Sequence, residues 1–124
     1  MRVFKTRWFT RWADKEGLID AALIAAVAEM CVGLIDANLG GQIFKKRVGI
    51  AGRGKSAGLR VLLAFQVGDR ACFVFGFAKN ERADVSDLEL LSLKRLVAEF
   101  LGYDDEELAQ ALHVGKLYEV KKHE

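Results

Sequence analysis

The sequence contains only two cysteines and two histidines among its 124 residues, and each shortage excludes a class of protein. Two thiols cannot form the dense disulfide set that stabilises a small secreted domain, so a reducing cytoplasm is the expected compartment. Cys31 and Cys72 lie in apolar segments and are expected to be buried. His113 and His123 have no second ligand at a metal-binding spacing, so we predict no metal site and no cofactor.

Long apolar runs are also missing. The longest weakly charged stretch, residues 21–32, contains Glu29 and is shorter than the roughly 20 apolar residues that a membrane-spanning helix needs. The basic amino terminus precedes neither an apolar run nor a small-residue cleavage site, so no export signal is predicted. Hydrophobic residues make up 52% and charged residues 29% of the chain, which is typical of one folded domain with no membrane partner.

Basic residues are concentrated in one segment, although the net charge is only +2. No acidic residue occurs between Lys45 and Arg60. The cations of this basic block are Lys45, Lys46, Arg47, Arg53, Lys55 and Arg60. Such a block attracts polyanions, but an ordinary solvated loop can have the same charge, so its position in the fold must decide.

Apolar spacing predicts two helices after a short strand at residues 3–4. The first helix is expected to end near Gly17 and the second to begin at Asp20. The glycine-rich cluster at residues 38–41 should stop the second helix. Its predicted buried stripe consists of Leu23, Ala26, Val27, Met30 and Leu34.

Three strands are predicted next, at residues 43–48, 59–67 and 71–78, with a flexible basic loop over residues 49–58. Gly68 and Asp69 have the chemistry of a two-residue type II′ turn.

Helix signals then return towards the carboxyl end. A capping box beginning at Ser86 predicts a helix over residues 87–101, and Asp104 should cap a short helix ending near Leu112. Residues 117–120 are predicted to add an edge strand.

The element order predicts an α+β fold. We expect an antiparallel sheet of three to four strands, with two amino-terminal helices packed on one face and further helices at the carboxyl end. Residues 1–124 are expected to form a single domain, in which residues 102–124 are a carboxy-terminal extension.

Counting back from a pair between residues 67 and 70 sets Arg60 opposite Phe77, with Lys79 as its diagonal neighbour. Strand parity places Lys45 and Arg47 on the same face, so four cations converge. Lys46 has the opposite parity and reaches that face only by extending past the sheet edge.

The same count assigns the aromatic and small side chains of the last strand. Phe73, Phe75 and Phe77 fall on the cationic side, either as a stacking platform for bases or beneath the carboxy-terminal helix, which we favour. Cys72 and Val74 fall on the side of the amino-terminal helices.

Residues 49–56 match the phosphate-binding Walker pattern Gly-x-x-x-x-Gly-Lys-Ser. A Walker loop must lead into a helix of a parallel sheet. The segment after Ser56 instead has the residues of a strand followed by a hairpin, so the glycines are interpreted as flexibility in a cationic loop.

Three stretches together resemble the RelE/HigB family of bacterial toxins, especially its HigB-like branch. They are Phe-Lys-Lys-Arg-Val at 44–48, Gly-Leu-Arg-Val at 58–61 and Gly-Phe-Ala-Lys-Asn-Glu-Arg at 76–82, and the resemblance extends over residues 34–101. It implies a cytoplasmic toxin that cuts mRNA, commonly on the ribosome, and so inhibits translation. It also implies a partner antitoxin, often a helix-turn-helix DNA-binding protein.

The resemblance implies catalytic roles for Lys45, Arg47, Arg60 and Lys79. Cleavage without a metal needs a base for the ribose 2′-hydroxyl, cations for the phosphorane and an acid for the leaving oxygen. Lys45 is the predicted base, Arg60 and Arg47 the phosphate clamp, and Lys79 a phosphate contact or proton donor. The expected RNA or ribosome contacts are Lys46, Arg53, Lys55, Arg82 and Phe77.

Two other functions fit the same elements. A ParE-like toxin shares the fold but acts on DNA gyrase and needs no catalytic cations. A nucleic-acid-binding module would hold the RNA backbone without cutting it. Truncated transcripts would indicate the endoribonuclease, and DNA damage would indicate the gyrase-directed toxin. Transcripts that stay intact and bound would indicate the binding module.

Overall fold

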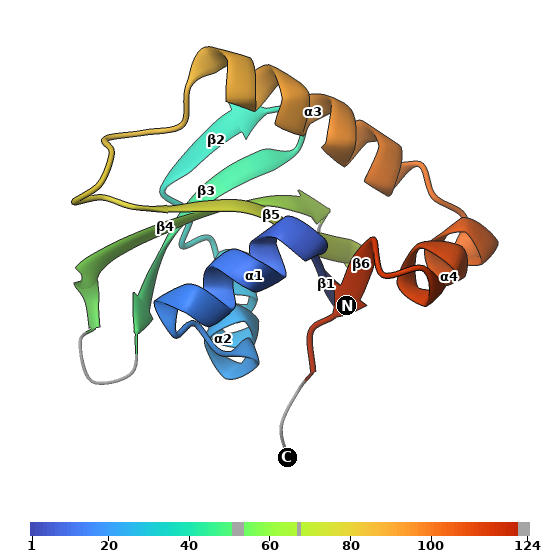
Figure 1. The fold of residues 1–124 in the computed structure, drawn as a ribbon, viewed down its shortest axis with the longest axis horizontal. Coiled ribbons are helices and arrows are strands. Elements are labelled where there is room, and N and C mark those ends of the chain that lie inside the picture. The colour runs from blue at the N-terminus through green and yellow to red at the C-terminus, as the bar shows by residue number, and fades with distance from the viewer. Residues whose placement is uncertain (51–53, 67, 122–124) are drawn as a thin grey trace.

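The computed structural model describes residues 1–50, 54–66 and 68–121, and in that part of the chain four helices pack on a six-stranded sheet (Figure 1). The strand order is β2-β3-β4-β5-β1-β6. The pair β1–β5 is parallel and the other pairs are antiparallel. The elements are β1 (Arg2–Thr6), α1 (Arg7–Glu16), α2 (Asp20–Cys31), β2 (Ala37–Gly40), β3 (Ile43–Ile50), β4 (Gly54–Gln66), β5 (Arg70–Ala78), α3 (Asp87–Leu101), α4 (Asp105–His113) and β6 (Leu117–Glu119).

Three helices begin or end at the predicted residues because local capping fixes them. Gly17 ends α1 with a positive φ of 77°, which glycine adopts without strain. Ser86 and Glu89 form the predicted capping box of α3, and Asp104 forms a second box at the start of α4. The expected α+β character is therefore confirmed, although the sheet has more strands than predicted.

Helix α2 ends at Cys31, earlier than predicted. Gly33 has a φ of 93° and the chain leaves the helix there, so Leu34 is 54% exposed instead of buried. Cys31 is also exposed, contrary to expectation. The other four residues of the predicted stripe are buried. The edge strand β2 was missed because asparagine and glycine are poor strand formers.

The sheet has a hydrophobic core on each face. Helices α1 and α2 cover one face, where Phe9, Leu23 and Phe73 are fully buried. Helices α3 and α4 cover the other, where Val97 and Leu108 pack against the sheet. Figure 1 shows α3 on the side of the sheet opposite α1 and α2. The carboxy-terminal helix therefore covers part of the face on which the cations were predicted.

The β4–β5 hairpin reaches the predicted register by two irregularities that cancel. Gln66 pairs with Arg70, so the connection is one residue longer than the predicted turn. A register shift between Leu62 and Leu63 then restores Arg60 opposite Phe77.

The shift between Leu62 and Leu63 reverses the predicted faces of the first half of β5. Phe73 packs on the α1 side, whereas Cys72 and Val74 pack on the α3 side. The predicted start of β4 at residue 59 was wrong as well, since the strand begins at Gly54, inside the predicted loop.

The carboxy-terminal segment completes the sheet. β6 pairs with β1, and the Val120 N–H donates to the Val3 carbonyl at 2.8 Å. Arg2 and Glu119 form an ion pair across this edge, with nitrogen and oxygen 2.9 Å apart. The predicted edge strand is thus confirmed, and it lies beside the first strand of the chain. Among the described helices, none has the length and hydropathy needed to cross a membrane.

Candidate functional site

The register of three strands brings the predicted catalytic cations to one face of the sheet. Arg47 pairs with Arg60, which pairs with Phe77, and Lys45 lies in the neighbouring row opposite Leu62. The Lys79 N–H donates to the Gly58 carbonyl at 2.7 Å and continues the pairing beyond β5, on the Arg60 side. We call the surface formed by Lys45, Arg47, Arg60, Lys79 and Arg82 the cationic face.

Arg60 and Lys79 form the open part of the cationic face. Neither has a carboxylate partner among the described residues. Arg60 is half-buried, and its guanidinium donates to the Leu59 carbonyl at 3.3 Å, while Lys79 is exposed. Their remaining donors are available to an anion such as a phosphate.

The other three cations are each held by a carboxylate. Lys45 Nζ lies 3.2 Å from Asp84 in the loop before α3. Arg47 Nε lies 3.4 Å from Asp36, in the segment between α2 and β2. Arg82 donates to Glu89 of α3 through both terminal guanidinium nitrogens, Nη1 and Nη2. An incoming phosphate must therefore compete with the protein's own carboxylates for these cations.

Asp84, just before α3, and Glu89, in its first turn, both remain ionised at neutral pH. The Arg82 hydrogen bond and the Ser86 N–H lower the pKa of Glu89 to about 2. Partial burial alone would raise the pKa of Asp84, but the Val85 N–H and the charge of Lys45 outweigh it, so this pKa lies below its ordinary value. The negative charges of Asp84 and Glu89 therefore reduce the positive charge that a bound polyanion would meet at Lys45 and Arg82.

Two predicted RNA contacts lie in positions that RNA cannot reach. Lys46 is only 4% exposed and faces α2, where its Nζ is 2.6 Å from a Glu29 oxygen. Phe77 is 3% exposed beneath the α3 layer. Lys46 forms a structural ion pair and Phe77 belongs to the core. The predicted RNA contacts of these two residues are therefore corrected. Arg53 and the side chain of Lys55 lie outside the described residues.

A family model described as the RelE toxin of the RelE/RelB toxin–antitoxin system matches residues 1–120. The chain belongs to the RelE toxin family. No curated protein matches the sequence. Family membership makes the chain a toxin with an antitoxin partner, and the match includes α4 and β6, beyond the stretch that carried the sequence resemblance.

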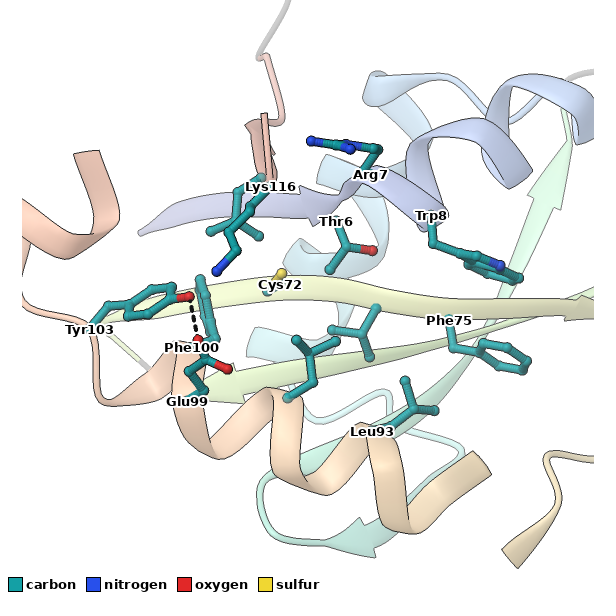
Figure 2. A pocket seen from close by; sticks show the side chains of 13 residues that line it. Thr6, Arg7, Trp8, Cys72, Phe75, Leu93, Glu99, Phe100, Tyr103 and Lys116 are labelled. Carbon is teal, nitrogen blue, oxygen red and sulfur yellow. Dashed lines mark hydrogen bonds between the residues drawn. The ribbon is translucent and has the colours of Figure 1, made fainter. Parts of the chain in front are cut away.

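This RelE toxin has one exposed aromatic residue beside the cationic face that sequence reasoning missed. Trp8, at the start of α1, is 48% exposed and stacks on Phe75 with ring centroids 4.7 Å apart (Figure 2). The Arg82 guanidinium lies 5.6 Å from the Phe75 ring. The sequence gives no signal for this contact, because it depends on where α1 crosses the sheet.

A cysteine nucleophile and a metal centre are the other kinds of site to consider in the RelE toxin. Burial raises the pKa of the Cys72 thiol, which makes it a poor nucleophile. Within the described ranges, no three histidine, cysteine or acidic side chains are grouped to hold a metal ion. The cationic face is therefore the candidate site.

Proposed function

We propose that this RelE toxin is an endoribonuclease that cuts mRNA on the ribosome and thereby stops translation in the cytoplasm. One observation carries the proposal: Arg60 and Lys79 lie on the same face of the hairpin with no carboxylate partner in the described structure, and Lys45 and Arg47 flank them. A scissile phosphate needs such a group of cations, because negative charge accumulates on its oxygens during cleavage.

The proposed reaction uses the ribose 2′-hydroxyl as nucleophile. Arg60 and Arg47 bind the scissile phosphate. Lys45, after it has left Asp84 and lost one proton to solvent, accepts the hydroxyl proton as a neutral amine. The 2′-oxygen then bonds to phosphorus as the bond to the 5′-oxygen breaks. Lys79 contacts the phosphate or donates the proton that the departing 5′-oxygen requires. The products are a cyclic phosphate and a free 5′-hydroxyl, and no external reductant or oxidant is needed.

We also propose a HigB-like branch for the toxin, on the three sequence stretches that resemble it, and an antitoxin of the helix-turn-helix type. Lys45 and Arg47 compete with internal carboxylates, so the RNA must offer several phosphates at once. A messenger held extended on the ribosome satisfies this condition, which supports the ribosome as the place of cleavage.

Arg60→Glu tests the proposed function. Reversing this charge should lower the cleavage of mRNA on programmed ribosomes by about 10²–10³-fold, as removal of one electrostatic contact typically does. Arg11→Glu, an exposed charge on α1, is the matched control and should cut at the wild-type rate.

Three results would contradict the proposal. The first is unchanged cleavage by Arg60→Glu. The second is intact transcripts that remain bound to the wild-type toxin, which would indicate a binding module. The third is DNA damage without truncated transcripts, which would indicate a gyrase-directed toxin.

A further inference from the structure

Trp8 is an exposed aromatic side chain whose position the fold fixes. The Thr6 hydroxyl accepts from the Phe9 N–H at 3.1 Å and determines where α1 begins. Trp8 follows in the first turn, where its ring lies 4.7 Å from the Phe75 ring at an interplanar angle of 14° (Figure 2). The indole is 48% exposed although Phe75 packs against it, so part of a flat aromatic surface is open to solvent.

Phe75 connects Trp8 to the cationic face. Phe75 and Lys45 lie in one row across the sheet, because both pair with Leu62 of β4. Two strand spacings separate them, which is roughly 10 Å. The Arg82 guanidinium lies 5.6 Å from the centre of the Phe75 ring. Trp8 therefore adjoins the place proposed for the scissile phosphate.

The edge of β5 beside Trp8 has room for a ligand. β1 pairs with β5 as far as Lys5 and Phe73, and no described strand pairs with this edge of β5 beyond Phe73. A groove of about 500 Å³, lined by Trp8, Phe75 and Leu93 among others, opens there (Figure 2). This volume is within the range of sites that hold small organic ligands, so a base that projects from a bound RNA strand can enter it.

Cations next to an exposed aromatic ring are the combination that single-stranded RNA requires. Cations bind its phosphates, and aromatic rings stack on its bases. Tyr118 of β6 is also exposed, at 42%, but β1 separates β6 from β5. Of these two exposed aromatic side chains, Trp8 is thus the one that lies beside the cationic face.

We propose that Trp8 stacks on a base of the mRNA next to the scissile phosphate. This inference deepens the proposed function and rests on it. The stack forms when the message binds and persists in the transition state, so Trp8 should act on KM and leave kcat nearly unchanged. Purines overlap an indole ring more fully than pyrimidines do, so a purine at this position should be modestly favoured.

Trp8→Ala tests the proposal, with Trp8→Phe as the conservative variant and Tyr118→Ala as the matched control. On ribosomes programmed with a defined message, Trp8→Ala should raise KM about 10-fold and change kcat less than about 2-fold. Trp8→Phe keeps an aromatic ring and should recover most of the loss, while Tyr118→Ala should resemble wild type. Thermal melts show whether each variant is folded at the assay temperature.

A message that lacks one base provides a second measurement, which wild type alone can report if Trp8→Ala does not fold. The probe is an mRNA with a 2′-O-methyl ribose at the cut site, which cannot be cleaved, and its toxin affinity is measured on programmed ribosomes by sedimentation. Removing the base beside the scissile phosphate should weaken binding about 10-fold in wild type but less than about 2-fold in Trp8→Ala, because ring and base form one contact.

The outcomes separate this inference from the proposed function. The stacking contact would be overturned if base removal had no effect on wild type, or had the same effect on wild type and Trp8→Ala. A lower kcat with unchanged KM in Trp8→Ala would also overturn it. Unchanged KM with weaker antitoxin binding would assign the ring to the antitoxin instead. Coupling between Trp8 and the base, without cleavage of the unmodified message, contradicts only the proposed function.

Discussion

Lys45 and Lys46 are neighbours in the sequence but lie on opposite faces of the sheet. Lys46 is buried beneath α2 with Glu29, whereas Lys45 reaches Asp84 in the loop before α3. The faces differ in how they are covered, because α1 and α2 close one side while the cationic face borders the end of α3. Strand alternation therefore gives one lysine a structural role and leaves the other available for a ligand.

The two faces also differ in how far their charged side chains are buried and paired. On the α2 side a buried ammonium has a carboxylate in close contact, as burial of a charge requires. On the α3 side the ion pairs are partly solvated, and Arg60 and Lys79 have no acid partner among the described residues. A buried pair fixes the fold, while solvated and unpaired cations can exchange partners.

The largest expected effect is a loss of stability when a side chain is added at Gly76, where β5 packs against Trp12 of α1. A Cβ atom at Gly76 would lie 2.2 Å from Trp12 Cζ3, so Gly76→Ala should displace α1 and lower the free energy of unfolding by about 3 kcal/mol. Urea denaturation measures the loss. Gly102→Ala, where the nearest atom is 3.4 Å away, is the control and should change little. A double variant that adds Trp12→Leu should recover part of the loss, and no recovery would refute the steric explanation.

Lys45→Ala should separate activity from stability on the cationic face. We expect mRNA cleavage to fall about 100-fold, since the proposed base is removed. The free energy of unfolding should change by less than about 1 kcal/mol, because the Lys45–Asp84 pair is partly solvated. Ribosome cleavage assays and thermal melts of the same preparation provide both numbers. A large drop in melting temperature with unchanged cleavage would reverse the comparison with Lys46.

Lys46→Met should produce the opposite pattern. The methionine keeps most of the buried volume but removes the ammonium that Glu29 binds, so we expect a loss of about 2 kcal/mol. Glu29 is partly exposed, which keeps the effect below that of a fully buried pair. Cleavage at temperatures where the variant is folded should match wild type. If the rate fell as in Lys45→Ala, Lys46 would have to contact RNA.

The smallest effect concerns the acid side of the pH profile. The pKa of Glu89 is depressed to about 2 in the folded state by Arg82, so the contact stabilises the fold above about pH 4.5 and is lost as the pH falls towards 2. Both side chains are largely solvated, so solvent screening keeps the contribution of this contact small.

Thermal melts of Glu89→Gln should therefore lie slightly below wild type at pH 7 and converge with it near pH 2. A constant difference between Glu89→Gln and wild type across this range would mean that the ion pair is not its cause.

Local chemistry made several elements predictable from the sequence. The capping box that begins at Ser86 and the αL cap at Gly17 depend only on neighbouring residues, so α3 and the end of α1 matched expectation. Arg60 opposite Phe77 was also predicted, but only because a longer turn and a bulge cancel. The bulge carries no clear residue signature, and its consequence, the exchange of Phe73 with Cys72 and Val74 between the faces, could not be foreseen.

By itself, the sequence determined which cations share a face of the hairpin, because side chains alternate with a period of two. Only the tertiary structure decided which of them remain open. The positions of α2 and α3 bury Lys46 and Phe77 and set Asp84 against Lys45. Trp8 reaches Phe75 beside the paired strands β1 and β5, whose partner residues lie more than sixty positions apart in the sequence. Such contacts depend on the packing of distant elements, which no local pattern encodes.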